Sequence, residues 1–177
     1  MPKYLAALFA ILLAVPAAAQ HHGQGGHSYA PLLQRPIKAL SADDIAGLRA
    51  GRGMMLALPA ELNRYPGPMH VLEHAAALGL NAAQKQAIER QMADMRAEAM
   101  ALGERIISGE EALEKLFLSA GADAAAVDRL TAELGALWGK LRATHLAAHV
   151  ATRAVLSGAQ IAQYQKLRGY EAGTHRH

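Results

Sequence analysis

The chain has 177 residues, a formal net charge of +3, nine histidines and no cysteine. This length fits a single domain behind a short leader, and the lack of cysteine excludes disulfides and thiolate metal ligands. The weak positive charge, without a compact basic cluster, gives no basis for nucleic-acid binding. Aromatic residues make up only 5% of the chain, so the composition favours helix over sheet, and we expect an all-α fold.

Residues 1–19 have the organisation of a secretory signal peptide. Lys3 supplies positive charge, residues 5–15 are unbroken apolar, and Pro16 precedes three alanines. The apolar run is about a dozen residues, short of the ~20 that a membrane-spanning helix requires. We expect cleavage after Ala19 and a periplasmic protein, and an N-terminal segment kept as a membrane anchor is the alternative.

Residues 20–67 contain many His, Gly and Pro residues and should hold only one or two short helices. The start of this segment and residues 171–177 at the C-terminus lack the apolar side chains that offset the entropy of ordering. We therefore expect a flexible N-terminal segment and a disordered tail. Within the segment, Ser41 and Asp44 have capping-box spacing and predict one short helix that ends near Gly51.

Residues 68–170 should form a regular helical domain that begins and ends with short helices. Pro68 suits the first turn of a helix over residues 69–78, which Gly79 would end. Ser157 and Gln160 have capping-box spacing for a last helix that runs to about residue 170.

Two long helices are predicted between these short ones. Asn81 and Gln84 form the capping box of the first, Gly121 ends it, and Asp123 caps the second. Steps of four and three residues define a heptad-like seam on both. Its residues are Ile88, Met92, Met95, Ala99, Leu102, Ile106, Leu113 and Leu116 on the first helix, and Val127, Leu130, Leu134, Leu137, Leu141, His145, Ala148, Thr152 and Val155 on the second.

The short turn at residues 119–123 makes the two long helices an antiparallel hairpin. One partner helix alone does not seal either seam. We therefore expect the short first and last helices, or a second subunit, to cover the rest, and we expect a homodimer.

Two five-residue segments repeat one pattern. Leu80-Asn81-Ala82-Ala83-Gln84 and Leu156-Ser157-Gly158-Ala159-Gln160 each place a capping side chain three residues before a glutamine. Behind a signal peptide and around a long hairpin, they resemble the Leu-Thr-x-x-Gln repeat of the periplasmic Spy/CpxP superfamily, with Asn and Ser in place of Thr. That superfamily includes ZraP-type zinc-resistance proteins and CnrX-type nickel and cobalt sensors. The resemblance covers about residues 66–170.

The histidines extend the resemblance. His70 and His74 are similar to the His-x-x-x-His of the CnrX-type helix, and His145 and His149 precede the second repeat, where those sensors also have a histidine ligand. The chain departs from the sensor pattern at two ligands. The position that corresponds to the sensors' early carboxylate ligand is near Met92, with Glu89 one turn before it. The position that corresponds to their late methionine ligand is near residues 152–153. The full sensor ligand set is therefore not carried over.

The spacing of the histidines by itself predicts a metal site. Residues four apart share one helix face, and folding the hairpin brings both pairs within about two turns of each other. Such a site suits Zn, Ni, Co or Cu. Its predicted ligands are His70, His74, His145, His149, Met92, Glu73 and Glu89. The alternative is that His145 is a hydrogen-bonded core residue and that His74 and His149 are exposed polar residues.

Methionines allow a second interpretation of the metal chemistry. Copper would suit them, but flexible apolar filler is the favoured interpretation of their role. The residues concerned are Met54, Met55, Met69, Met92, Met95 and Met100.

Enzymatic motifs are absent from the sequence. Glu73 follows His70 by three residues rather than one, so the His-Glu-x-x-His of zinc proteases is missing, and we expect no enzyme. The hypothesis is a periplasmic heavy-metal-binding stress, resistance or sensor protein. The alternative is an ATP-independent chaperone that holds unfolded clients on a helical cradle. Expected partners are a second copy, a metal ion, and unfolded periplasmic proteins or a membrane stress sensor.

Overall fold

A computed structural model describes residues 28–170, and every regular element in this range is a helix, as predicted. The predicted signal peptide and the predicted C-terminal tail lie outside the described residues. Contacts divide the chain into two units, Met1–Pro31 and Leu32–His177. A short 3-10 helix covers Ala30–Gln34, and the α-helices all belong to the second unit. No helix within residues 28–170 is both long and apolar enough to cross a membrane.

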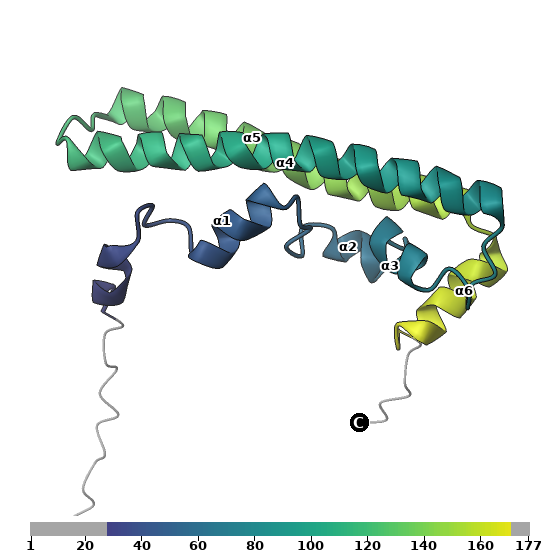
Figure 1. The fold of residues 1–177 in the computed structure, drawn as a ribbon. Coiled ribbons are helices and arrows are strands. Elements are labelled where there is room, and N and C mark those ends of the chain that lie inside the picture. Colours follow the sequence, from purple (N-terminus) through teal and green to yellow (C-terminus); the bar gives the residue numbers. More distant parts are fainter. Residues whose placement is uncertain (1–27, 171–177) are drawn as a thin grey trace, which may run out of the picture. The chain divides into compact units, whose positions relative to one another are not determined.

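The predicted antiparallel hairpin is confirmed (Figure 1). It consists of α4 (Ala82–Leu118) and α5 (Ala124–Val155), which lie side by side. Asn81 and Asp123 cap the two helices, accepting hydrogen bonds from the backbone N–H groups of Gln84 at 2.8 Å and Ala126 at 2.7 Å. The chain leaves α4 through Ala120 in the left-handed region, with φ 55°. The helix therefore ends just before the predicted Gly121.

Short helices pack along the hairpin. They are α1 (Ala42–Arg49), α2 (Leu58–Glu61), α3 (Pro68–Glu73) and α6 (Gly158–Leu167). Ser41 caps α1 through a capping box with Asp44, as predicted. This helix approaches α4 closely at Gly103, where any Cβ would overlap the backbone carbonyl of Leu48. A residue without a side chain is therefore required at this crossing.

Two separate apolar cores hold the hairpin and the short helices together. The larger core contains Ile37, Leu40, Leu48, Ala99, Leu102, Ile106, Ile107, Leu134 and Leu141. The smaller one, near the base of the hairpin, contains Val71, Leu78, Ile88, Leu156, Ile161 and Tyr164. Most of the buried residues of α4 and α5 occupy predicted seam positions. Between the two cores, residues 92–96 of α4 and 145–149 of α5 are left free to line a cavity.

Two short helices end earlier than the sequence predicts. The expected helix over residues 69–78 is wrong in its second half, because α3 stops at Glu73 and His74 is its C-cap. Residues 74–79 follow as turns that place Leu78 in the smaller core and reach Gly79 at φ 60°. Helix α6 stops at Leu167 because Gly169 adopts φ 68°, which turns the following Tyr170 back toward Glu61.

Candidate functional site

The glutamines of the two repeated motifs bind each other. The amide nitrogen Nε2 of Gln84 donates to Oε1 of Gln160 at 2.9 Å, and Nε2 of Gln160 donates back to Oε1 of Gln84 at 3.1 Å. Each Oε1 also accepts from the backbone N–H of its own cap residue, Asn81 or Ser157. Gln84 donates in addition to the Val155 carbonyl at 2.9 Å. The two capping boxes are thereby joined into one unit that fastens the start of α4 to the start of α6.

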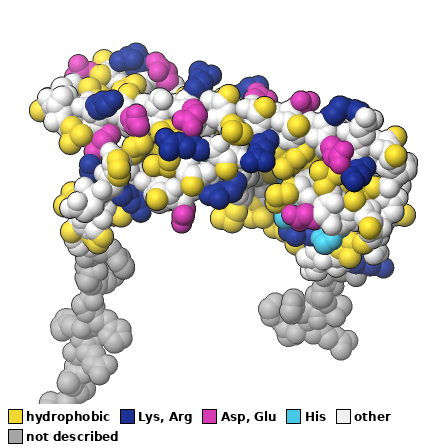
Figure 2. Space-filling model, in the orientation of Figure 1, with side chains coloured by type: hydrophobic (Ala, Val, Ile, Leu, Met, Phe, Trp, Pro, Cys, Tyr) yellow, Lys and Arg dark blue, Asp and Glu magenta, His cyan; other side chains and the backbone are white. Residues whose placement is uncertain are grey.

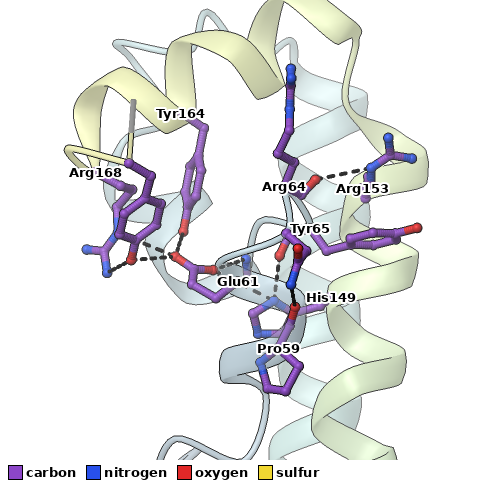
Figure 3. Close-up of polar contacts among 11 residues, drawn as sticks. Pro59, Glu61, Arg64, Tyr65, His149, Arg153, Tyr164 and Arg168 are labelled. Atoms are coloured by element: carbon purple, nitrogen blue, oxygen red, sulfur yellow. Dashed lines mark hydrogen bonds and ion pairs between the residues drawn. The ribbon is translucent and has the colours of Figure 1, made fainter. Parts of the chain in front are cut away.

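A buried carboxylate ties the N-terminal segment to α6 (Figure 3). The side chain of Glu61 is only 9% exposed. Its Oε1 accepts from the hydroxyls of Tyr164 at 2.5 Å and Tyr170 at 3.1 Å, and Arg168 Nε lies 3.5 Å away. Its Oε2 accepts from the Gly67 N–H at 3.2 Å. Burial, reinforced by the hydrogen bond to Glu61, raises the pKa of the Tyr164 phenol, which therefore remains a hydrogen-bond donor.

His149 connects the same segment to α5. Its Nδ1 lies 2.7 Å from the Tyr65 carbonyl oxygen and 3.7 Å from Glu61 Oε2. The imidazole ring fills the space beside Gly67, where a Cβ would come within 2.8 Å of Cε1. One helical turn further on, Arg153 lies over the Tyr65 ring, 4.7 Å from its centroid. Residues 61–67 are therefore held against α5 by several independent contacts (Figure 3).

These contacts border a cavity of about 630 Å³ between the two cores. Its walls come from residues 50–58, from the start of α3, from α4 and α5, and from residues 168 and 170 after α6. Figure 2 shows histidine beside charged side chains at the edge of a hydrophobic area on this face of the molecule. Four residues of the predicted metal set line the cavity: His70, His145, His149 and Met92.

The three histidines of the cavity are in states suited to metal binding. Nδ1 of His70 lies 2.8 Å from Oε2 of Glu73, and Nδ1 of His149 lies against the Tyr65 carbonyl oxygen. A carbonyl oxygen only accepts, so Nδ1 of His149 is the donor, which leaves Nε2 out of this hydrogen bond. His145 is 4% exposed and its Nε2 has no hydrogen-bond partner within the described residues.

The other three predicted ligands lie elsewhere. Glu73 contacts His70 but does not line the cavity, and His74 is the C-cap of α3. Glu89 lies 3.9 Å from Lys85 Nζ on the outer face of α4. Within residues 28–170, no three His, Asp or Glu side chains lie close enough together to hold a metal ion. The seven predicted residues are therefore not brought into one site, since Glu73, His74 and Glu89 do not line the cavity.

The charge around the cavity is mainly positive. Arg52, Arg96 and Arg168 contribute to its walls, and Glu61 is the carboxylate among the described lining residues. Arg96 Nε donates to the Ala50 carbonyl at 3.3 Å, which holds its guanidinium beside the cavity. An ion that binds here therefore depends on neutral donor atoms rather than on an acidic cluster.

Sequence reasoning missed two groups of residues in this region. No signal in the sequence distinguishes Glu61, since a single carboxylate next to Pro59 is typical of an exposed first helical turn. The sequence shows the methionines, but it favours for them a role as apolar side chains that fill the core. Five of the chain's seven methionines line the cavity: Met54, Met55, Met69, Met92 and Met95. Their gathering could be found only from the fold, because they come from three separate segments.

A long α-helical hairpin with two mutually bonded capping boxes at its base is the architecture expected of a Spy/CpxP-type protein, and proteins of this type are typically periplasmic. The profile described as LTXXQ motif family protein matches residues 69–168, and the chain belongs to that family. No curated protein and no solved structure matches the chain.

The paired glutamines can be tested apart from their capping role. Gln84→Glu keeps a capping-box acceptor, but a carboxylate cannot donate to Gln160 Oε1 or to the Val155 carbonyl. We expect urea unfolding to show a loss of about 1–2 kcal/mol in the free energy of unfolding. Gln86→Glu, the same change at an exposed position on α4, should stay within about 0.5 kcal/mol of wild type. Equal effects of the two substitutions would contradict a role for the pairing.

Burial of His145 should make stability depend on pH. Desolvation, together with the nearby His149, lowers the pKa of His145 below its ordinary value of 6.5. As pH falls below 6.5, the imidazole takes up a proton in the unfolded chain before it does so in the folded protein. The free energy of unfolding should therefore decrease on the acid side, and His145→Leu should reduce this slope. Urea unfolding at a series of pH values measures it, and an unchanged slope in the variant would oppose the assignment.

Proposed function

We propose that this protein is a periplasmic heavy-metal-binding stress or resistance protein that holds a transition-metal ion in the cavity between its two cores. The observation that carries the proposal is the convergence of histidines from α3 and α5 on one cavity. His145 and His149 are the central donors, and His70 lies at the opening. Imidazole nitrogen suits Zn, Ni, Co and Cu alike.

The surroundings of the histidines support this function. A metal-binding histidine commonly donates its other ring N–H to a carbonyl or a carboxylate, which orients the ring and fixes the tautomer. His149 has this arrangement with the Tyr65 carbonyl, and His70 has it with Glu73. In the second case, the hydrogen bond from His70 lowers the pKa of the Glu73 carboxyl, so the acceptor stays ionised. In both rings Nε2 is then the nitrogen available to an ion.

Metal titration with a conservative variant tests the proposal. In His149→Asn the side-chain amide takes the place of Nδ1 and can still donate to the Tyr65 carbonyl, but Nε2 is lost. We expect calorimetric titration of Zn²⁺ and Ni²⁺ into the full chain to show affinity lower by about tenfold or more. His74→Asn, outside the cavity, is the matched control and should bind like wild type. Wild-type affinity and stoichiometry in His149→Asn would refute the assignment.

A chaperone role is the second candidate, favoured by the apolar rim of the same cavity. Met55, Leu58 and Met69 line the cavity, and Leu62 lies close to them in the chain; all four side chains are exposed. Methionine adapts its shape to varied apolar partners, and contiguous exposed apolar surface marks interaction sites. An unfolded client could place apolar side chains on this rim.

Suppression of client aggregation tests the chaperone role. Wild-type protein at near-stoichiometric ratio should suppress light scattering from a chemically unfolded client, and Leu58→Glu/Leu62→Glu should weaken this effect. Phe117→Glu, which changes an exposed apolar residue at the tip of the hairpin, is the control and should keep the activity. If wild-type protein has no effect on aggregation, this candidate is eliminated.

A further inference from the structure

Core packing does not account for all the methionines of the cavity. Met55 is 80% exposed and Met69 is 47% exposed, so neither side chain fills space inside a core. Met54 and Met95 pack against the larger core, yet both also line the cavity. Leucine would supply the same apolar volume at these positions. Packing therefore does not explain why a sulfur-containing side chain occupies each of them.

Backbone strain marks the segment that carries two of these methionines. Met54 and Met55 are consecutive and both lie in the left-handed region, with φ 43° and 62°. This region disfavours every residue with a Cβ, and glycine would occupy it freely. Strained non-glycine residues persist mainly where a functional constraint maintains them. A functional constraint on the two thioethers beside the cavity therefore explains why both methionines keep a strained backbone conformation.

A histidine of α5 with a buried, unpartnered nitrogen lines the same cavity as two methionines of α4. His145 lines the cavity, is almost fully buried, and its Nε2 has no hydrogen-bond partner within residues 28–170. Buried polar atoms in native proteins are nearly always satisfied, and an exception calls for an explanation such as an ion. Met92 and Met95 lie three residues apart on one face of α4, and they line the same cavity.

Charge and donor type together select the kind of ion. The guanidinium groups of Arg52, Arg96 and Arg168 repel a divalent ion twice as strongly as a monovalent one. The Glu61 carboxylate, which would offset this repulsion, is already occupied by the two tyrosines, Arg168 and the Gly67 N–H. The donors left over are neutral thioethers and histidine imidazoles, and soft sulfur ligands select Cu(I).

We propose that the cavity is a Cu(I) site in which His145 and the thioethers of Met92 and Met95 bind the ion, with Met54 and Met55 supplying further sulfur donors. The inference rests on the proposed metal-binding function and specifies its ion. It assigns to the methionines a role beyond that of the histidine pairs, and two of these five residues, Met54 and Met55, precede the matched family region, which starts at residue 69.

Sulfur-selective variants test this proposal. The full chain is titrated with Cu(I) under anaerobic conditions against the chromogenic chelator bathocuproine disulfonate. Wild-type protein should compete for one Cu(I) in the cavity, and Met92→Leu/Met95→Leu, which conserves apolar volume, should bind it about tenfold or more weakly. Met100→Leu changes a methionine on the same helix that does not line this cavity and should bind like wild type.

A second variant separates ligation from packing. Met55→Gly should raise the midpoint of thermal unfolding, because glycine adopts φ 62° without strain, while it lowers the affinity for Cu(I). X-ray absorption at the copper edge should show sulfur neighbours in wild-type protein and fewer in Met92→Leu/Met95→Leu. Wild-type Cu(I) affinity in both methionine variants, or a copper spectrum without sulfur, would overturn the inference.

The experiments distinguish failure of the Cu(I) assignment from failure of the proposed metal-binding function. If Zn²⁺ and Ni²⁺ binding depends on His149 while Cu(I) binding ignores the methionines, the metal-binding function stands and the Cu(I) assignment is wrong. If Cu(I) binding depends on Met92 and Met95, the assignment is supported. Because Met→Leu preserves the apolar rim, client suppression should survive in the variant that loses Cu(I), so a chaperone role is also distinguished.

Discussion

The buried carboxylate of Glu61 is the contact on which the cavity depends. It is bonded to both tyrosines near the C-terminal end, to Arg168 and to the backbone of Gly67, and it lies beside His149. One side chain thus joins α2, the start of α3, α5 and α6. Removing one partner of a buried charged group typically costs about 3–5 kcal/mol. Without this contact, residues 61–67 would lose their attachment to α6 and keep only their contacts with His149 and Arg153 of α5.

The two helices of the hairpin contribute residues both to the apolar cores and to the cavity. Residues of α4 and α5 enter the larger core, then line the cavity, then enter the smaller core. His145 lies at a seam position where an apolar residue would pack better, and an unsatisfied buried nitrogen costs about 1–3 kcal/mol. Two left-handed methionines cost about 1–2 kcal/mol each. The apolar burial on either side of the cavity offsets these costs.

The candidate site was predictable only in part. The spacing of His145 and His149 placed both on one face of a helix, and folding the hairpin correctly brought Met92 to the same cavity. His74 does not line the cavity with His70, although the two histidines are four residues apart. The turns over residues 74–79, which follow α3 and bury Leu78, could not be predicted from the spacing of the histidines. The methionines were visible in the sequence, but their distribution over three segments concealed that they meet.

Local chemistry determined much of this protein from the sequence alone. Capping residues act within three positions of a helix start, and heptad spacing acts within one helix, so the bounds of α1, the starts of the long helices, the hairpin and the seam could all be predicted. Tertiary structure alone decided that the two motif glutamines bond to each other, that Glu61 is buried, and that five methionines line the same cavity as His145. These features join residues tens of positions apart in the chain. Spacing within a helix carries no information about such contacts, which arise only when separate segments fold against one another.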